Sequence, residues 1–547
     1  MSTDSAAPPK QRMAMGRWIV TVGGYTLGSR VLGFIRDILI AWSIGTGPVA
    51  DAFFVALRVP NFMRTLFAEG AFNAAFVPQF AGTYERDGAA AARTVAEEAL
   101  ALLLAALLFV VVAAQIAMPW LMYVLAPGFI DDPAKFDLTV TLTRITFPSL
   151  LFISLAALLG GVLNSLYRFA AAAAAPILLN LCLIIAILTL GRITETPGHA
   201  LAIGVAVAGV VQFVWLVVAC SRAGMGLRLH WPKLTPSVRR LLKVIGPAAL
   251  GAGVAQVNLL VSVIIASLLP EGAVSYLYYA DRLNQVPIGV VGVAVGTALL
   301  PLLSRQIRAN DENAASHSQN RAIEVAVFLA LPAAVALIVS AHPIMRVLFE
   351  RGAFDARATS AAAGALMAYA AGLPAFILVK VLAPGYFARQ DTRTPVIIAV
   401  VCVALNVVLN LSLMHVLGHI GLALSLSIAG WLNVLLLARG LHRRGHFRAD
   451  ARLKRRLLAI GGASALMAAV LYGLGVVLVD ALSGSQSMRV GGLVGLVLGG
   501  FVVYVGSARL FGAFTVRELA SSLRRCDGGT GHARKNGAGS LDPPASA

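Results

Sequence analysis

Long apolar runs recur along the whole chain, and they limit its fold more than any other feature. An α-helix needs about 20 apolar residues to cross about 30 Å of hydrocarbon. Runs such as ALALLLAALLFVVVAA, which begins at Ala99, approach that length without a charge. Inside a bilayer every backbone polar group must find a partner within the chain, and this condition favours helices. We therefore expect one all-α polytopic membrane domain, not a series of soluble domains.

Pro, Gly and charge clusters interrupt these runs and set the limits of the predicted spans. Fourteen spans result, at residues 18–44, 49–80, 98–125, 137–165, 171–191, 199–221, 245–269, 273–302, 323–345, 359–386, 395–416, 420–438, 457–479 and 490–512.

The placement of Lys and Arg predicts the orientation of these spans. The chain has 44 Lys plus Arg against 25 Asp plus Glu, a formal net charge of +19, although 59% of its 547 residues are hydrophobic. Thirty of the basic residues lie in tails and loops on the side that holds both termini, and six lie in the opposite loops. Cytoplasmic loops retain positive charge. We therefore predict that both termini are cytoplasmic.

The same division predicts the domain organisation. We expect, in chain order, a cytoplasmic tail (1–17), an N-lobe of six helices (18–222), an amphipathic linker (223–244), a C-lobe of six helices (245–438), a basic linker (439–456), two further helices (457–512) and a disordered cytoplasmic tail (513–547).

The remaining eight basic residues lie inside predicted spans. They are Arg30, Arg36, Arg58, Arg64, Arg144, Arg282, Lys380 and Arg509. Lys380, Arg509 and Arg144 are placed to extend toward an interface. An arginine at a helix centre costs about 2.5–3.5 kcal/mol. The other five, in the first, second and eighth spans, therefore favour a hydrated, positively charged cavity over fully paired buried ion pairs.

Nearby acids are predicted to hold some of these arginines. Arg30 and Asp37 are seven residues apart, as are Asp51 and Arg58, so each pair shares one face of a helix. In the second span Pro60 removes a backbone donor and kinks the helix.

A ligand drawn to several guanidinium groups is expected to be anionic, and the planar arginine fork suits phosphate. Pyrophosphate and phosphate esters are the best candidates. The loop charges are the ordinary topological signal, so we expect no nucleic-acid partner. The four cysteines are isolated and predict neither a disulfide framework nor a metal site. We therefore expect no metal and no cofactor.

Two other classes of protein fit less well. A membrane-embedded transferase would need clustered acids for a divalent metal and long loops for a soluble donor. A cation-coupled drug exporter would need acidic or aromatic cavity walls, and five arginines would repel organic cations. We predict a transporter, not an enzyme.

Five segments in order carry a family resemblance. They are SRVLGFIRD from Ser29, DAFFVALRVPNFMR from Asp51, LFAEGAFNAAFVPQF from Leu66, YYADRLNQVPIGVVGVAVGTALLP from Tyr278 and KVLAPGYFARQDTRTPV from Lys380. Between about residues 18 and 512 the chain resembles the MurJ (MviN) lipid II flippases of bacteria.

The resemblance implies a member of the multidrug/oligosaccharidyl-lipid/polysaccharide exporter superfamily. Two six-helix lobes would enclose a central cavity, and the two C-terminal helices would form a groove for a polyprenyl tail. The substrate would be lipid II, the undecaprenyl-pyrophosphate-linked peptidoglycan precursor, moved by alternating access to the periplasmic leaflet of the inner membrane. The alternative is another lipid-linked oligosaccharide or drug exporter of this superfamily. The expected partners are lipid II and membrane lipids, and we expect a monomer.

The resemblance also implies site residues, by motif. The substrate-binding set is Arg30, Arg36, Arg64, Arg282 and Asn61. The cavity-supporting set is Asp37, Asp51, Arg58, Pro60, Ser29 and Gln285. Some relatives have a glutamate where this chain has Gln285, which cannot titrate. One branch has a sodium site with Asn and Asp where this chain has Asn406 and Asn410, so the sodium ion is not carried over.

Overall fold

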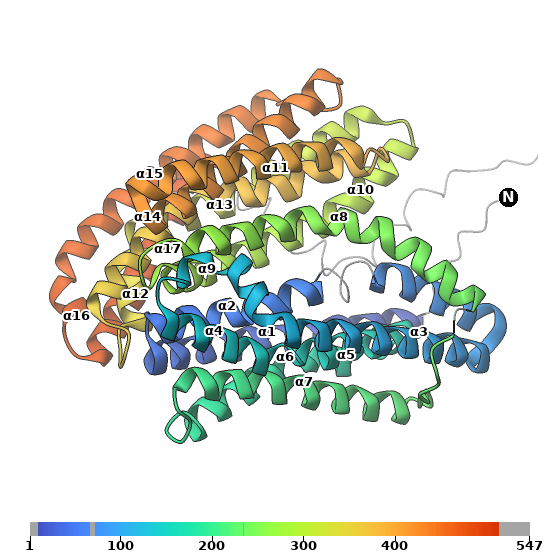
Figure 1. Cartoon of the computed structure of the whole chain (residues 1–547). Coiled ribbons are helices and arrows are strands. Elements are labelled where there is room, and N and C mark those ends of the chain that lie inside the picture. Colours follow the sequence, from blue (N-terminus) through green and yellow to red (C-terminus); the bar gives the residue numbers. More distant parts are fainter. Residues whose placement is uncertain (1–8, 66–71, 234, 514–547) are drawn as a thin grey trace, which may run out of the picture.

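The computed structural model describes residues 9–65, 72–233 and 235–513. Within these ranges the chain forms helices and no strands, so the predicted all-α membrane fold is confirmed (Figure 1). Residues 1–8 of the predicted N-terminal tail and 514–547 of the predicted C-terminal tail lie outside the described residues.

The helices fall into three groups in chain order. The first group is α1 (Pro9–Ile44), α2 (Pro48–Met63), α3 (Asn73–Leu125), α4 (Pro133–Thr146), α5 (Ser149–Ser165), α6 (Phe169–Thr189) and α7 (Pro197–Arg222). The second is α8 (Pro236–Ser267), α9 (Ala273–Pro287), the π-helical turn η3 (Ile288–Gly292), α10 (Val293–Arg308), α11 (Glu312–Val339), α12 (Ala341–Phe349), α13 (Ala356–Phe387) and α14 (Arg393–Arg443). The third is α15 (Ala451–Val477), α16 (Val479–Ser483) and α17 (Gln486–Leu510). A 3-10 turn, η2 (Pro127–Phe129), precedes α4.

Ten helices of the described ranges are long and apolar enough to cross a membrane. Two of them run through a glycine with non-helical backbone angles, Gly88 in α3 (φ 82°) and Gly418 in α14 (φ 55°). Both glycines lie where the sequence separates two predicted spans. The count of fourteen spans stays a prediction, because length and apolar character alone select ten.

Prolines divide three predicted spans more finely than expected. The α-helical part of α2 ends at Met63, shortly after Pro60, and residues 64–65 are π-helical, whereas the predicted second span is one helix to residue 80. Pro148 separates α4 from α5, and Pro287 precedes η3 between α9 and α10. Each proline lacks the N–H that would continue the helix hydrogen bonds.

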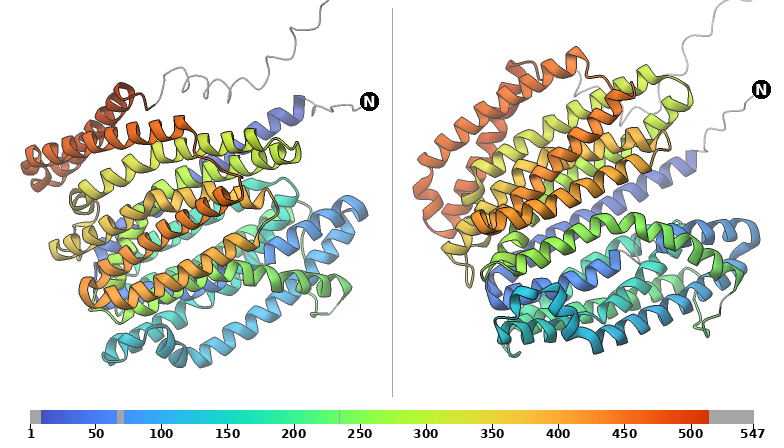
Figure 2. Two further views of the ribbon diagram at one scale, coloured as in Figure 1. Left: turned by 90° about the horizontal axis from the view of Figure 1, so that it is seen from above. Right: turned by 45° about the horizontal axis from the view of Figure 1, so that its top comes forward.

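The first and second groups form two bundles, drawn in blue to bluish green and in bright green to orange (Figures 1 and 2). In the first, α6 packs on α1 and α7, and α5 packs on α3 and α7. In the second, α13 packs on α9, α11 and α14. α15 packs on α11 and α17 at the outer side of the second bundle.

The bundles meet at the end of the molecule where α1 runs into α2, which we call the α1–α2 end. There the N–H of Ala353 donates to the carbonyl of Trp42 at 3.0 Å, and the Tyr279 hydroxyl donates to the carbonyl of Gly45 at 3.1 Å. The opposite end carries the loops around 223–233 and 444–450, and we call it the linker end. The Phe54 ring stacks on Tyr278 with 3.8 Å between centroids, so aromatic packing also joins the bundles.

Candidate functional site

A cluster of polar side chains joins α1 to α6 and α9. Arg36 donates to Asp37 Oδ1 from Nη2 at 2.7 Å, and to Asn180 Oδ1 from Nη1 at 2.8 Å. The Tyr278 hydroxyl donates to Asp37 Oδ1 at 3.2 Å, and Arg282 Nε lies 3.8 Å from Asp37 Oδ2. These five residues are the charge cluster. It brings together two of the predicted substrate arginines and one predicted supporting acid.

The two guanidinium groups of the charge cluster share one carboxylate. Asp37 is 4% exposed, so its charge is shielded from water, whereas the Arg282 side chain is 41% exposed. The Arg282 guanidinium also lies 4.6 Å from the Tyr278 ring centroid, a cation–π contact. With one acid for two arginines, the cluster keeps a net positive charge on its exposed side.

Arg30 lies near the cluster but is not paired as predicted. Asp37 forms ion pairs with Arg36 and Arg282, not with Arg30. The Arg30 guanidinium instead lies against η3 of the second bundle, where a Cβ added to Gly289 would come within 2.6 Å of Nη2. A side chain at this glycine would displace the guanidinium. The seven-residue spacing predicted that Arg30 and Asp37 contact each other on one helix face. In the structure Asp37 pairs with Arg282 of α9, and Arg30 lies against Gly289 of η3.

Asn180 is a central residue that the sequence analysis missed. It is 4% exposed and donates from Nδ2 to the carbonyl of Ser29 at 2.9 Å while it accepts from Arg36. Asn180 thereby fixes the distance between α6 and α1, and it connects the predicted supporting residue Ser29 to the cluster. The available signal was a lone amide in the apolar run LLNLCL of the fifth predicted span.

Asp51 does not contact an arginine, so the prediction that it holds Arg58 is wrong. Its carboxylate accepts from Lys135 Nζ at 2.9 Å, from the N–H groups of Gly272 and Ser275 at 2.8 and 3.0 Å, and from Ser275 Oγ at 2.6 Å. Asp51 is 1% exposed. It therefore caps the first turn of α9 from the other bundle, where the helix dipole favours an anion.

Lys135 is the second residue that the sequence analysis missed, because it is one of the six basic residues counted in the loops opposite the termini. It is 8% exposed and lies over the Phe129 ring at 4.0 Å. Its ammonium neutralises Asp51 within the first bundle. The three hydrogen bonds from α9 are the part of this contact that crosses between the bundles.

Arg58 and Asn61 lie outside the charge cluster, on the side of α2 that faces α8. Arg58 lines one small cavity together with Asp281 and a second one together with Asn61. Pro60 is buried within α2. The predicted site is thus divided between the charge cluster and these cavities, although Tyr278 of the cluster also lines the first cavity.

The last two predicted residues are Arg64, at the end of α2, and Gln285, on the surface of α9. Arg64 directly follows α2, and its backbone N–H donates to the carbonyls of Pro60 and Asn61. Gln285 is exposed and donates from Nε2 to Asp281 Oδ1 at 3.3 Å. Gln285 is therefore one helical turn from Asp281 and supports that acid.

The described residues contain no group of three or more His, Cys, Asp or Glu that could hold a metal ion. Asn406 donates from Nδ2 to Asn258 Oδ1 at 2.8 Å, and Asn410 is buried. The arrangement in the charge cluster is suited to a different task. Guanidinium groups from two bundles can bind a phosphate between them.

Known proteins match the chain over most of its length. The family model described as Lipid II flippase MurJ matches residues 40–488. The probable lipid II flippase MurJ of Rhizobium meliloti (strain 1021) is 46% identical over 524 residues, covering 94% of this chain and 97% of that protein. The lipid II flippase MurJ of Burkholderia cenocepacia is 38% identical over 464 residues, covering 84% of this chain and 90% of that protein.

Solved structures also resemble the fold of this chain. The structure titled "Lipid II flippase MurJ, inward closed conformation" has a TM-score of 0.76 at 27% identity and covers 92% of this chain and 100% of that one. An inward-facing multidrug resistance MATE family transporter of the MOP superfamily has a TM-score of 0.64 at 14% identity, over 81% of this chain and 99% of that one, and it shares the fold alone. By the family model and by relatives at 38% and 46% identity, this chain belongs to the MurJ family of lipid II flippases.

Proposed function

We propose that this chain moves lipid II across the bacterial inner membrane and that Arg36 and Arg282 bind its pyrophosphate. It acts as a transporter, not as an enzyme. The charge cluster is the observation that carries the proposal, since two arginines from different bundles share the single carboxylate of Asp37. A pyrophosphate placed there would be attracted to both bundles at once.

Arg30 would extend this site toward η3, and Arg64 would extend it along α2. Asn180 and Asp37 would orient Arg36, because both accept hydrogen bonds from its guanidinium. Arg30, Arg64 and Asn61 would contact the substrate only after the bundles move, since the charge cluster does not include them.

The Asp51 contact supplies a gate in this proposal. The α1–α2 end would face the periplasm, and both termini would be cytoplasmic. Three hydrogen bonds from α9 to Asp51 hold this end closed. Release of the substrate would require that they break, while the Lys135 pair within the first bundle persists.

We propose the predicted organisation for the remaining parts of the chain. The bundles would be the N-lobe (18–222) and C-lobe (245–438), joined by the linker at 223–244, and the basic linker at 439–456 would lead to the helices of 457–512. α15 and α17 carry exposed apolar side chains, Tyr472 and Phe501 among them, and would hold the polyprenyl tail. The working unit would be a monomer.

Complementation of a bacterium depleted of its own lipid II flippase tests the proposal. The unchanged chain is expected to restore growth, and Arg36→Ala and Arg282→Ala are expected to fail at equal membrane abundance. Arg144→Ala is the matched control, because Arg144 is an exposed arginine of α4 outside the charge cluster. Full growth with both cluster variants would refute the assignment.

A further inference from the structure

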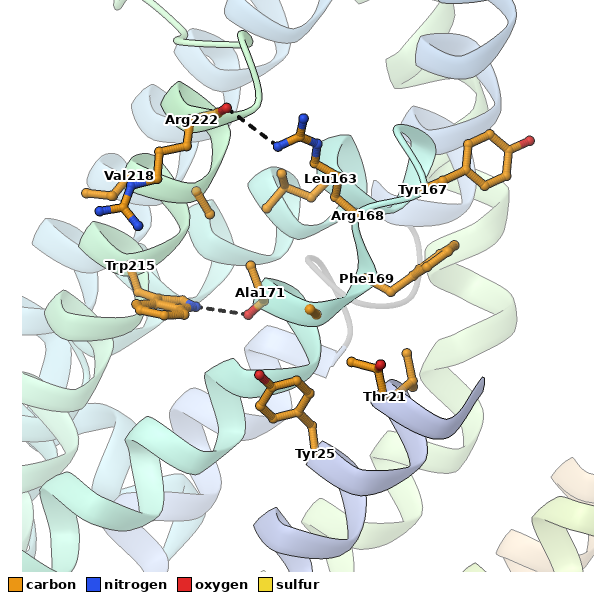
Figure 3. A pocket seen from close by; sticks show the side chains of 13 residues that line it. Thr21, Tyr25, Leu163, Tyr167, Arg168, Phe169, Ala171, Trp215, Val218 and Arg222 are labelled. Carbon is orange, nitrogen blue, oxygen red and sulfur yellow. Dashed lines mark hydrogen bonds between the residues drawn. The ribbon is translucent and has the colours of Figure 1, made fainter. Parts of the chain in front are cut away.

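A pocket of about 510 Å³ opens at the linker end of the first bundle (Figure 3). It lies between α1, α7 and the turn that joins α5 to α6. Tyr25, Phe169 and Trp215 form its aromatic walls, and Arg168 and Arg222 lie at its upper rim in Figure 3. None of the 13 lining residues is acidic.

The pocket is separate from the charge cluster and lies near the membrane surface. Tyr25 precedes Arg36 by eleven residues on α1, about 16 Å along the helix axis. From Thr21, which lines the pocket, to Ile44 at the α1–α2 end, α1 is about 35 Å long, whereas the hydrocarbon layer is about 30 Å thick. The pocket therefore lies at the depth of lipid headgroups and upper acyl chains, where aromatic side chains gather.

The rim offers positive charge without a competing acid. Arg168 Nη1 donates weakly to the carbonyl of Arg222 at 3.5 Å. Among the ion pairs of the described ranges, none includes Arg168 or Arg222. Arg168 is also the N-cap of α6 and supplies no capping hydrogen bond from its side chain. The first turn of α6, which lines the pocket at Ala170 and Ala171, thus adds its positive dipole end to the two guanidinium groups.

The walls below the rim are apolar and held in place. Trp215 is 43% exposed, and its Nε1 donates to the carbonyl of Ala171 at 3.1 Å, which fixes the indole at the pocket wall. Tyr25 contributes a ring that is 37% exposed from the facing helix α1. A chain of CH₂ groups fits such a wall, and a soluble anion would leave it in contact with water.

We propose that this pocket binds one anionic membrane phospholipid, with its phosphate between Arg168 and Arg222 and an acyl chain along Phe169, Tyr25 and Trp215. Charge complementarity selects the anionic headgroup, and the aromatic wall selects a lipid. The bound lipid connects α1 to the α6–α7 side of the bundle. The site does not use the residues proposed to bind lipid II, so either proposal can fail while the other stands.

Fluorescence quenching by brominated lipids tests the proposal on the full chain. The chain is reconstituted in phosphatidylcholine vesicles with increasing fractions of brominated phosphatidylglycerol or, in parallel, brominated phosphatidylcholine. The contribution of Trp215 is obtained as the tryptophan fluorescence of the unchanged chain minus that of the Trp215→Phe variant. We expect half-maximal quenching at an anionic lipid fraction at least about tenfold below that of the neutral lipid, since each arginine near the surface contributes about fivefold.

Charge variants identify the source of the preference. The double variant R168Q/R222Q is expected to remove the preference, and R168K/R222K to keep most of it. The matched control R305Q/R308Q removes two exposed arginines at the end of α10, also at the linker end, and is expected to leave Trp215 quenching unchanged. Equal quenching by both lipids in the unchanged chain overturns the proposal, as does an unaltered preference in R168Q/R222Q.

Two competitors test the identity of the occupant. Inorganic phosphate at millimolar concentration is expected to leave the quenching unchanged. Undecaprenyl pyrophosphate is expected to displace the brominated lipid no better than unlabelled phosphatidylglycerol does. Displacement of the brominated lipid by inorganic phosphate would overturn the assignment to a bilayer phospholipid. So would its displacement by undecaprenyl pyrophosphate at a much lower fraction than unlabelled phosphatidylglycerol requires.

Discussion

Ser275→Ala is predicted to loosen the α1–α2 end without unfolding the protein. Ser275 is fully buried, and its hydroxyl donates to Asp51 Oδ1 at 2.6 Å, one of three hydrogen bonds from α9 to that carboxylate. A hydrogen bond to a charged group contributes about 1.5–3 kcal/mol. Because the contact crosses between bundles, only the closed state loses it. The ratio of open to closed molecules should therefore rise by about 10- to 100-fold.

Hydrogen exchange measures this ratio directly. The backbone N–H groups of Gly272 and Ser275 donate to Asp51, so they exchange when the bundles separate. In lipid nanodiscs, a peptide that spans 270–277 is expected to exchange these amides about 10- to 100-fold faster in Ser275→Ala. Thr146→Val is the control, since Thr146 donates to Ala56 within the first bundle. Unchanged exchange in Ser275→Ala, or equal acceleration in the control, would refute the gate.

Three further predictions concern positions outside the gate. Gly289→Ala is expected to keep the melting temperature but to weaken binding of a prenyl pyrophosphate severalfold, because the new Cβ displaces the Arg30 guanidinium; an unchanged affinity in a binding titration would contradict this. Asn180→Leu removes the acceptor of Arg36 Nη1 and leaves Asp37 as the acceptor of this guanidinium, and it is expected to lower the same affinity by about 5- to 100-fold, whereas equal affinity would exclude a positioning role. At the linker end, the N–H and hydroxyl at the start of α14, together with Arg444, lower the pKa of Asp391 to about 2. A carboxylate whose pKa is lowered on folding stabilises the folded state at a pH above its unfolded pKa of 3.8, and this stabilisation is lost as the pH falls toward 2. Asp391→Asn should therefore reduce the free energy of unfolding by about 1 kcal/mol at pH 7, and the difference should shrink below pH 4 in thermal unfolding.

The membrane fold was predictable from the sequence because the bilayer imposes a simple rule. Apolar runs long enough to span hydrocarbon must be helical, and the glycines at 88 and 418 lie between runs. The prolines were harder to interpret. Pro60 predicted a kink within one span, whereas the α-helical hydrogen bonds of α2 end at Met63 and residues 64–65 are π-helical.

The arginines of the site were predictable, but their partners were not. The cost of burying a charge singles out five arginines from the sequence, and Arg36 and Arg282 of the charge cluster are two of them. Helical spacing can predict only contacts between residues of the same helix, and for that reason Asp51 was predicted to pair with Arg58. The structure gives Asp51 partners from α4 and α9, 84 and more than 200 residues away. Asn180 was missed because one amide in an apolar run carries no local pattern.

Transport of labelled lipid II by the reconstituted chain tests the central claim most directly. Purified protein in liposomes is loaded with lipid II in one leaflet, and its exposure in the other leaflet is followed with time. The account predicts exposure with the unchanged chain and with Arg144→Ala, and its loss in Arg36→Ala and Arg282→Ala that remain folded. Equal lipid II exposure in all four proteins would contradict the claim that the charge cluster binds the pyrophosphate.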